Sequence, residues 1–229
     1  VPVLDPVFLP NDGLPLGLTD LNGTLLFAAT DAEHGTELWR SDGTAGGTVL
    51  VADLVPGPES SYPALYPGTS SLIYFSARNA ATGPELSRTD GTEAGTFVLK
   101  DILPGPETGL RNTLGSLGEL FFFAADDGVH GREPWRTDGT PDGTILLGDL
   151  VPGPASSDIW SMGVLNGALF FSLYDGTATN LWKTDGTSAG TVAVGPLPSA
   201  FLSSGTVGGF LVFSASDPVH GTELWRTDG

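Results

Sequence analysis

The strongest constraint on this chain is a short motif that occurs five times along its length. The first copy begins at Glu37 and reads Glu-Leu-Trp-Arg-Ser-Asp-Gly-Thr-Ala-Gly-Gly-Thr. The motif aspartates, which are 48, 48, 47 and 43 residues apart, are Asp42, Asp90, Asp138, Asp185 and Asp228. A nearly constant period of this length indicates that one supersecondary unit is repeated and that neighbouring units stack on one another.

Each repeat unit contains four short apolar runs bounded by turn-forming residues, which is the pattern of four β-strands. The runs span residues 62–66, 71–77, 85–89 and 96–100 in the second unit, and residues 110–114, 119–125, 133–137 and 144–147 in the third. No window shows sustained 3.6-residue periodicity, so we expect almost no helix. Five units of four strands predict an all-β chain, a five-bladed β-propeller, because one small sheet cannot bury its own faces.

The expected blades form one domain and span about residues 13–53, 61–101, 109–149, 157–195 and 200–229. Residues 1–7 resemble the strand that follows the motif elsewhere, as at Val49 to Val55, whereas the fifth motif reaches only Asp228-Gly229. We therefore expect residues 1–7 to supply the fourth strand of the last blade and to close the ring. We call the loop between the second and third strands of a blade the rim loop, and the segment leading to the next blade the crossing loop.

Two further patterns indicate how the blades are held together. The second strand of each unit is the most apolar, as in Leu120 to Ala125, which is typical of a strand buried on both faces. Four of the five tryptophans occupy one motif position, which predicts packing between blades: Trp39, Trp135, Trp182 and Trp225. Five of the nine basic residues lie two positions before the motif aspartate, where we expect weak charge pairs along the turns: Arg40, Arg88, Arg136, Lys183 and Arg226.

Composition narrows the range of partners. The chain has 27 acidic and 9 basic residues and a formal net charge of −18, which argues against nucleic acid and against anionic lipid surfaces. A cationic ligand such as calcium is compatible with that charge. The absence of cysteine excludes disulfides and thiolate metal sites. No apolar run approaches the roughly 20 residues of a membrane helix, so we expect no membrane insertion, and residues 1–12 do not resemble a signal peptide.

The repeated motif resembles that of the Glu-Leu-Trp-x-x-Asp-Gly-Thr repeat proteins of myxobacteria and other bacteria, and the likeness covers essentially the whole chain. This resemblance implies a β-propeller of tachylectin-like size and blade number in a secreted or cell-surface protein, and it carries no settled activity. The Asp-Gly hairpins also resemble, more weakly, the Asp-boxes of sialidase-like propellers. Ser87, Pro134 and Asn180 depart from the motif.

Three rim loops share the pattern Asp-x-x-His-Gly-x-Glu and contain all three histidines of the chain. The loops carry Asp31, His34 and Glu37; Asp127, His130 and Glu133; and Asp217, His220 and Glu223. An aspartate, a histidine and a glutamate on one loop could hold a divalent cation or hydrogen-bond a sugar. The alternative, which repetition favours, is that the aspartate caps the turn, the histidine packs across the loop and the glutamate begins the strand.

The residues that follow each crossing loop differ between blades on an otherwise uniform frame, which suits a binding face. The crossing loops share a Pro-Gly turn, and after it the candidate ligand-binding residues are Tyr62, Tyr66, Asn112, Asp158 and Trp160. Trp160 ranks first because an aromatic ring is a platform for sugar C–H faces and apolar ligands. The alternative for Trp160 is plain packing within the fold.

Sequence signatures of catalysis are absent, among them Gly-x-Ser-x-Gly, His-Glu-x-x-His and phosphate-binding loops. We therefore expect no catalytic residues and a non-enzymatic extracellular binding propeller, lectin-like or adhesive, whose partners are glycans or cell-surface proteins. The alternative is a structural scaffold for protein–protein interaction. A glycoside hydrolase is less favoured, because its two acids would lie on different blades, whereas most acids here repeat.

Overall fold

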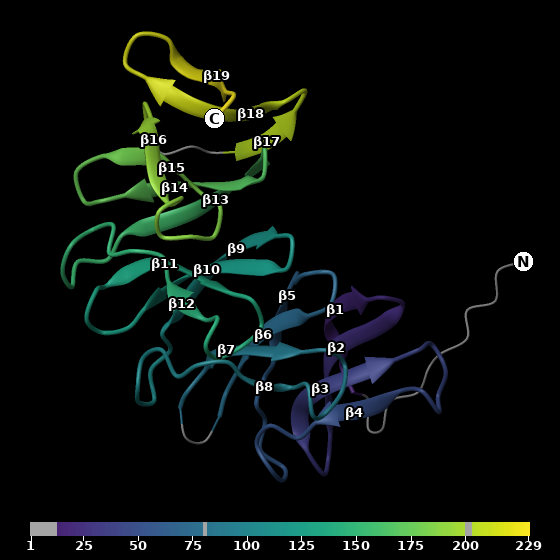
Figure 1. Ribbon diagram of the computed structural model, residues 1–229. Helices are drawn as coiled ribbons and strands as arrows, with labels where there is room; N and C mark the ends of the chain where they lie inside the picture. Colours follow the sequence, from purple (N-terminus) through teal and green to yellow (C-terminus); the bar gives the residue numbers. More distant parts are fainter. Residues whose placement is uncertain (1–12, 80–81, 200–202) are drawn as a thin grey trace, which may run out of the picture. The chain divides into compact units, whose positions relative to one another are not determined.

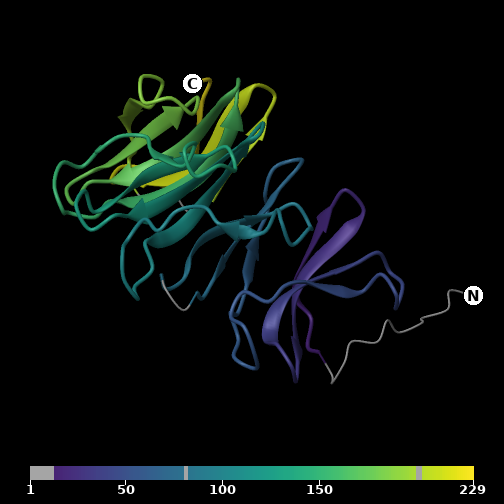
Figure 2. The same ribbon diagram turned by 60° about the horizontal axis from the view of Figure 1, so that its bottom comes forward.

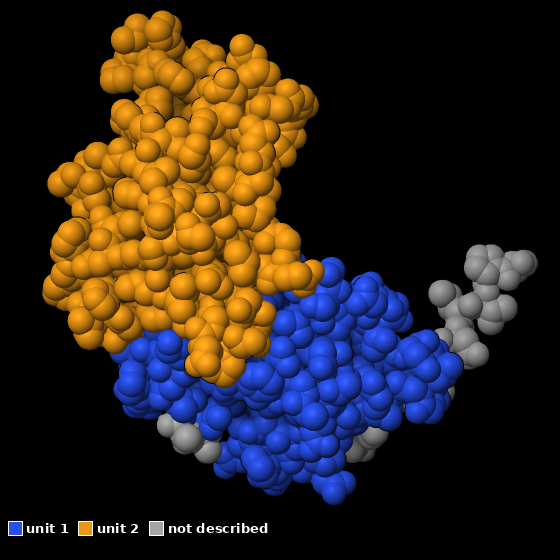
Figure 3. Space-filling model, in the orientation of Figure 1, with its two compact units in different colours: residues 1–108 blue, residues 109–229 orange. Residues whose placement is uncertain are grey.

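The computed structural model describes residues 13–79, 82–199 and 203–229, and every regular element in these ranges is a β-strand. The strands form five antiparallel sheets (Figure 1). The chain divides into two compact units, residues 1–108 and 109–229 (Figure 3), with two sheets in the first and three in the second. None of the described residues belongs to a helix that could span a membrane.

The first unit contains two four-stranded sheets in which strands adjacent in sequence are paired. The first sheet is β1 (Leu16–Leu21), β2 (Thr24–Asp31), β3 (Gly35–Ser41) and β4 (Val49–Ala52). The second sheet is β5 (Ala64–Tyr66), β6 (Ile73–Ala77), β7 (Glu85–Thr89) and β8 (Phe97–Val98). The four runs predicted for the second repeat are therefore confirmed, with the outer strands shorter than expected.

The second unit contains two more four-stranded sheets of this kind and a last sheet of which three strands are described (Figure 2). Its sheets are β9 (Leu110–Leu117), β10 (Leu120–Asp126), β11 (Arg132–Thr137) and β12 (Ile145–Leu146); β13 (Asp158–Leu165), β14 (Ala168–Tyr174), β15 (Thr179–Thr184) and β16 (Val192–Pro196); and β17 (Ser203–Val207), β18 (Phe210–Asp217) and β19 (Gly221–Thr227). The last sheet has three described strands. The fourth strand predicted for it, residues 1–7, lies outside the described residues.

Apolar clusters lie between successive sheets in each unit. In the first unit, Leu26 and Leu38 of the first sheet share a cluster with Ile73 and Phe75 of the second. In the second unit, one cluster joins β9–β12 to β13–β16, and another joins β13–β16 to β17–β19. The second strands β10 and β14 are buried on both faces, as their continuous apolar sequence predicted, whereas β18 alternates buried and partly buried residues.

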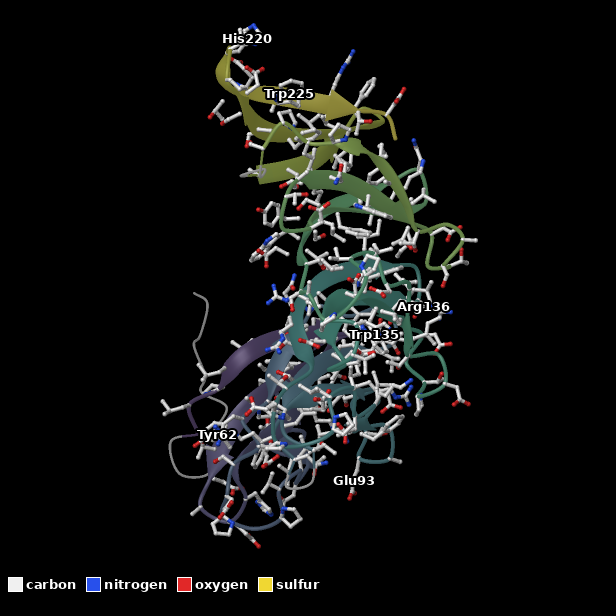
Figure 4. The ribbon with its side chains drawn as sticks, turned by 90° about the vertical axis from the view of Figure 1, so that its left-hand side faces the viewer. Tyr62, Glu93, Trp135, Arg136, His220 and Trp225 are labelled. Atoms are coloured by element: carbon white, nitrogen blue, oxygen red, sulfur yellow. The ribbon has the colours of Figure 1, made fainter. Side chains whose placement is uncertain are left out.

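The motif tryptophans lie opposite a phenylalanine on the second strand of their own sheet. The ring centroids of Phe123 and Trp135, and those of Phe171 and Trp182, are 6.5 Å apart. Trp182 and Trp225 also contact the cluster shared with the preceding sheet, so the predicted packing between blades is confirmed at these two positions. Figure 4 shows Trp135 on β11 and Trp225 on β19.

Among the described residues, the motif basic side chains form no direct ion pair with the motif aspartates, although the Thr44 hydrogen bonds and, to a smaller extent, the Arg40 charge lower the pKa of Asp42. Arg40 Nη1 donates to the Gly91 carbonyl at 3.3 Å, Arg136 Nε to the Gly186 carbonyl at 3.1 Å, and Lys183 Nζ to the Gly229 carbonyl at 2.8 Å. Each acceptor is the Asp-Gly turn of the following sheet. The motif aspartates accept hydrogen bonds inside their own turns instead, so the basic side chains connect neighbouring sheets.

The motif turn is held by its aspartate and threonine. Asp42 Oδ1 accepts hydrogen bonds from the Thr44 backbone N at 2.9 Å and from Thr44 Oγ1 at 2.7 Å, and Thr44 Oγ1 accepts one from Gly47 N at 2.9 Å. The same bonds recur around Asp90, Asp138 and Asp185. A Cβ added at Gly47 would lie 2.0 Å from Asp42 Oδ1, so only glycine fits there.

Replacing Gly47 and its neighbour Gly46 tests this turn. We expect Gly47→Ala to destabilise the protein by about 2 kcal/mol, because the new methyl group displaces the Asp42 carboxylate. A Cβ at Gly46 meets nothing within 4 Å, so Gly46→Ala is the matched control and should change stability by less than about 0.5 kcal/mol. Urea unfolding of both variants provides the comparison, and equal effects would contradict the proposed role of Asp42.

Candidate functional site

The rim-loop aspartates cap their own turns. Asp127 Oδ1 accepts hydrogen bonds from the backbone N of Val129 at 2.9 Å and of His130 at 2.8 Å, and Asp127 Oδ2 lies 2.8 Å from His130 Nδ1. Asp31 with His34, and Asp217 with His220, repeat this arrangement. His220 lies at the tip of the last rim loop (Figure 4). These contacts match the structural interpretation of the Asp-His pattern.

Each of the first two Asp-His pairs favours its charged form. The hydrogen bond to Asp127 raises the pKa of His130, and the bond to Asp31 raises the pKa of His34. Partial burial acts to raise the pKa of Asp127, but the hydrogen bonds from His130 outweigh it and lower that pKa. The hydrogen-bonded Asp-His pair is therefore part of the loop's own structure.

The rim-loop glutamates point away from these pairs and bind the crossing loops. Glu37 is fully buried, and its carboxylate accepts hydrogen bonds from Leu54 N at 3.0 Å, Ser61 N at 2.9 Å and Ser61 Oγ at 2.6 Å. Glu133 is equally buried and accepts bonds from Leu150 N and Val151 N, both at 3.0 Å. We call these two residues the buried glutamates.

The metal candidates from the sequence therefore do not form one ligand set. Asp31 and Asp127 bind their own loops, Glu37 and Glu133 bind the crossing loops, and Glu223 is exposed on the last sheet beside the Asp217 loop. Among residues 13–79, 82–199 and 203–229, no three histidine, aspartate or glutamate side chains are grouped as metal ligands.

The rim loop and the crossing loop lie against each other in both units. Gly131 has φ +71°, and a Cβ added to it would lie 2.5 Å from the Ala155 carbonyl oxygen. Gly35 has φ +67° and stands in the same relation to the Glu59 carbonyl, at 2.6 Å. A side chain at either glycine would separate the loops. Each rim loop and its crossing loop therefore form one continuous surface.

One position on the first strand carries a different side chain in each of the five sheets. It is the residue paired with Ala28, Ser76, Ala124, Ser172 or Ser214 of the second strand, and it is occupied by Leu16, Ala64, Asn112, Trp160 and Ser203. We call it the variable position. Trp160 is 59% exposed there. Side chains that differ in every sheet, on a frame that repeats, distinguish this position from the core.

Trp160 lies within a group of polar side chains in the second unit. Asn112 Nδ2 donates to the Ile159 carbonyl at 2.8 Å, next to Trp160 in the chain. Arg132 Nη1 lies 2.7 Å from Asp158 Oδ1, and the Asp158 side chain is 60% exposed. We call Trp160, Asn112, Asp158 and Arg132 the Trp160 surface. The sequence analysis missed Arg132, although it stands where the other His-containing rim loops have Thr36 and Thr222.

The two tyrosine candidates belong to the first unit and differ in character. Tyr62 has φ +50° and is 59% exposed, and the guanidinium of Arg78 lies 5.4 Å from its ring centroid. Tyr66 is partly buried, and its hydroxyl lies 2.9 Å from Ser76 Oγ. Tyr62 is therefore available for ligand contact, whereas Tyr66 is used within its own sheet.

No protein-family model matches the chain, and no curated protein matches it. Several solved structures resemble its fold. A puromycin hydrolase has a TM-score of 0.55, 17% identity and coverage of 93% of this chain and 35% of that chain. A prolyl endopeptidase has a TM-score of 0.55 and 16% identity, with coverage of 93% of this chain and 32% of that chain. Prolyl oligopeptidase B from Galerina marginata has a TM-score of 0.55 and 12% identity, with coverage of 90% of this chain and 30% of that chain.

This chain thus spans about a third of the length of those proteins, at identities that show the fold alone. Together with the five repeated sheets, the likeness supports the β-propeller repeat fold that the motif spacing predicted.

The buried glutamates give stability a predictable pH dependence. Burial raises the pKa of Glu133 from 4.5 to about 7. The protonated side chain therefore contributes in full to the free energy of unfolding below pH 4.5, and this contribution is lost as the pH rises through 7. The raised pKa values of His34 and His130 act in the same direction. We expect higher stability at pH 5.5 than at pH 8, and Glu133 contributes at most about 2 kcal/mol of that difference, since part of its full effect is already lost at pH 5.5.

Urea unfolding at the two pH values checks this expectation. Glu133→Gln cannot ionise, so the difference between pH 5.5 and pH 8 should shrink in that variant. Glu93→Gln, on an exposed motif turn (Figure 4), is the control and should leave the difference unchanged. A Glu133→Gln variant with the pH dependence of the parent protein would show that Glu133 does not titrate in this range.

Proposed function

We propose that this chain is a non-enzymatic ligand-binding propeller, lectin-like or adhesive, and that the Trp160 surface contacts the ligand. The observation that carries the proposal is an exposed tryptophan at a position whose side chain differs in all five sheets. A large apolar ring left in water, on a frame whose other tryptophans are buried or partly buried, suggests selection for contact with a partner.

The chemistry of the Trp160 surface favours a carbohydrate. An indole ring offers an apolar face to the C–H side of a sugar, while the Asp158 carboxylate and the Arg132 guanidinium, 2.7 Å apart, offer an acceptor and donors for hydroxyl groups. The Arg132–Asp158 contact holds both side chains before binding, and Glu133 fixes the crossing loop that precedes Asp158. Such preorganisation reduces the entropy lost on binding.

The carboxylates near this surface support binding over hydrolysis. A glycoside hydrolase needs two carboxyl groups free to act on the scissile bond. The Asp127 carboxylate binds His130, and the Glu133 carboxylate accepts hydrogen bonds from two backbone amides. The Asp158 carboxylate is paired with Arg132. The alternative is a protein-interaction scaffold. It is favoured by the Asp-His pairs, because they recur in three rim loops and bind within their own loops, as structural residues do. We place the protein outside the cell or on its surface, where either kind of partner is found.

A glycan array tests the proposal, with and without added calcium. We expect binding to at least one glycan and at least a tenfold weaker affinity in Trp160→Ala, because a stacking ring contributes about 1.4 kcal/mol or more. Trp160→Phe should retain part of the affinity, and Val129→Ala, which removes an exposed apolar side chain from a rim loop, should retain all of it. An array without signal would favour the protein-interaction scaffold.

We also propose that residues 1–7 form the fourth strand of the last sheet and close the ring. The Gly13 carbonyl accepts a hydrogen bond from Thr30 N at 2.9 Å, as the Ser61 carbonyl does from Arg78 N at 2.7 Å. This equivalence, at an offset of 48 residues, aligns residues 1–4 with β4. Since Leu38 pairs with Ala52, Leu224 would pair with Leu4.

A cysteine pair in this cysteine-free chain tests the closure. In the double variant Leu4→Cys, Leu224→Cys we expect an intramolecular disulfide under mild oxidation, because paired strand residues lie within disulfide range. Mass spectrometry after proteolysis reads the link. The control pair Leu4→Cys, Val219→Cys places the second thiol on the rim loop and should not form the link. A disulfide only between molecules would argue for strand exchange, and none at all would argue against the pairing.

A further inference from the structure

One cross-strand pair beside the rim loop differs among the three sheets whose rim loops contain histidine. In the sheets β1–β4 and β17–β19 it consists of two hydroxyl side chains within hydrogen-bonding distance, Thr30 with Thr36 at 2.8 Å and Ser216 with Thr222 at 2.6 Å. In the sheet β9–β12 the pair is Asp126 and Arg132. Two opposite charges therefore replace a neutral pair whose members satisfy each other.

Asp126 and Arg132 each contact a further charged residue in the second unit. Asp126 Oδ2 lies 3.7 Å from Nη2 of Arg111 on β9, and Arg132 Nη1 lies 2.7 Å from Asp158 Oδ1 at the start of β13. The four side chains alternate in charge from β9, through β10 and β11, to the following sheet. We call Arg111, Asp126, Arg132 and Asp158 the charged row.

The β9 end of the charged row lies close to Trp160. Asn112, which follows Arg111 in the chain, donates from Nδ2 to the Ile159 carbonyl at 2.8 Å, and Ile159 directly precedes Trp160. Arg111 and Trp160 are therefore each one residue away from the same hydrogen bond between two sheets. A ligand whose ring stacks on Trp160 can carry a substituent that reaches Arg111.

Arg111 is the member of the charged row that is available to bind an anion. In Arg132, Nη1 is paired with Asp158 and Nε is buried without a hydrogen bond among the described residues, so only part of its fork is free. The Arg111 guanidinium lies 3.7 Å from Asp126, which is longer than a hydrogen bond. Asp126 thus attracts the Arg111 charge without occupying its five N–H donors.

We propose that the Trp160 surface binds a sugar that carries a carboxylate, with Trp160 stacking on the sugar ring and Arg111 binding the carboxylate. A planar guanidinium matches a carboxylate through two parallel N–H···O bonds, which a neutral sugar cannot offer. The net charge of −18 opposes polyanions, so we assign a ligand with a single carboxylate near the stacked ring. This inference rests on the proposed function and adds the chemical class of the ligand.

Paired glycans test the assignment. Glycans that each carry one glucuronic or sialic acid residue are compared with their own methyl esters, which keep the sugar and remove the charge. We expect the full chain to bind the acid at least tenfold more tightly than the ester, because the guanidinium–carboxylate contact is missing from the ester complex. Equal binding of acid and ester, with both weakened in Trp160→Ala, would leave the proposed function standing and overturn this assignment.

Substitutions at Arg111 identify the residue that reads the carboxylate. Arg111→Gln should lower the affinity for the acid to that for the ester and leave the ester unchanged. Arg111→Lys should keep part of the preference, because it retains the charge without the planar fork. Lys100→Gln removes one positive charge from an exposed residue outside the charged row, so it is the control and should change neither affinity.

The remaining outcomes are separable. A preference for the acid that survives Arg111→Gln would overturn the role of Arg111. Loss of acid and ester binding together in Arg111→Gln would show that this residue supports the surface and does not select the carboxylate. Binding of neither the acid nor the ester by the parent protein would overturn both this inference and the proposed function.

Discussion

The structure depends on the burial of sheet faces against neighbouring sheets. The second strand of each sheet is apolar on both sides, as in Phe121, Phe122 and Phe123, and none of these three rings is exposed. A four-stranded antiparallel sheet has no interior of its own, so it removes this surface from water only by stacking. The motif contributes to the same contact, since Arg136 and Lys183 reach the turn of the following sheet and Trp182 covers the cluster that two sheets share.

The buried glutamates connect that packing to the loops. Glu37 begins on a strand of the core, and its two carboxylate oxygens bind the crossing loop near both of its ends, at Leu54 and Ser61. Burying a carboxylate is costly, and the three donors offset only part of that cost, since burial still raises the pKa of Glu37. The crossing loop that precedes the variable position is thereby anchored at both ends, although the residues between its anchors belong to no strand.

Motif spacing and apolar runs predicted the strands well, because both signals are local. The rim-loop turns were also predictable, since Asp-x-x-His brings a carboxylate to its own backbone amides. Three features were not. The destination of the motif arginines depends on the turn of another sheet, and the role of Glu37 depends on amides 17 and 24 residues away. Arg132 was missed because its partner Asp158 lies beyond a whole crossing loop in the sequence. The sequence did show that Arg132 stands where the other two His-containing rim loops have threonine.

The anchoring of each crossing loop by one carboxylate has a consequence for how such a chain can diversify. Since Glu133 fixes the start of the loop at Leu150 and Val151, the segment beyond it can change its residues without disturbing the strand that supplies the anchor. Trp160 in one sheet and Ala64 in another are alternatives on the same scaffold. If the Trp160 surface binds a ligand as proposed, a different side chain at the variable position of one sheet would change the binding surface there while the repeated frame of the other sheets stays the same.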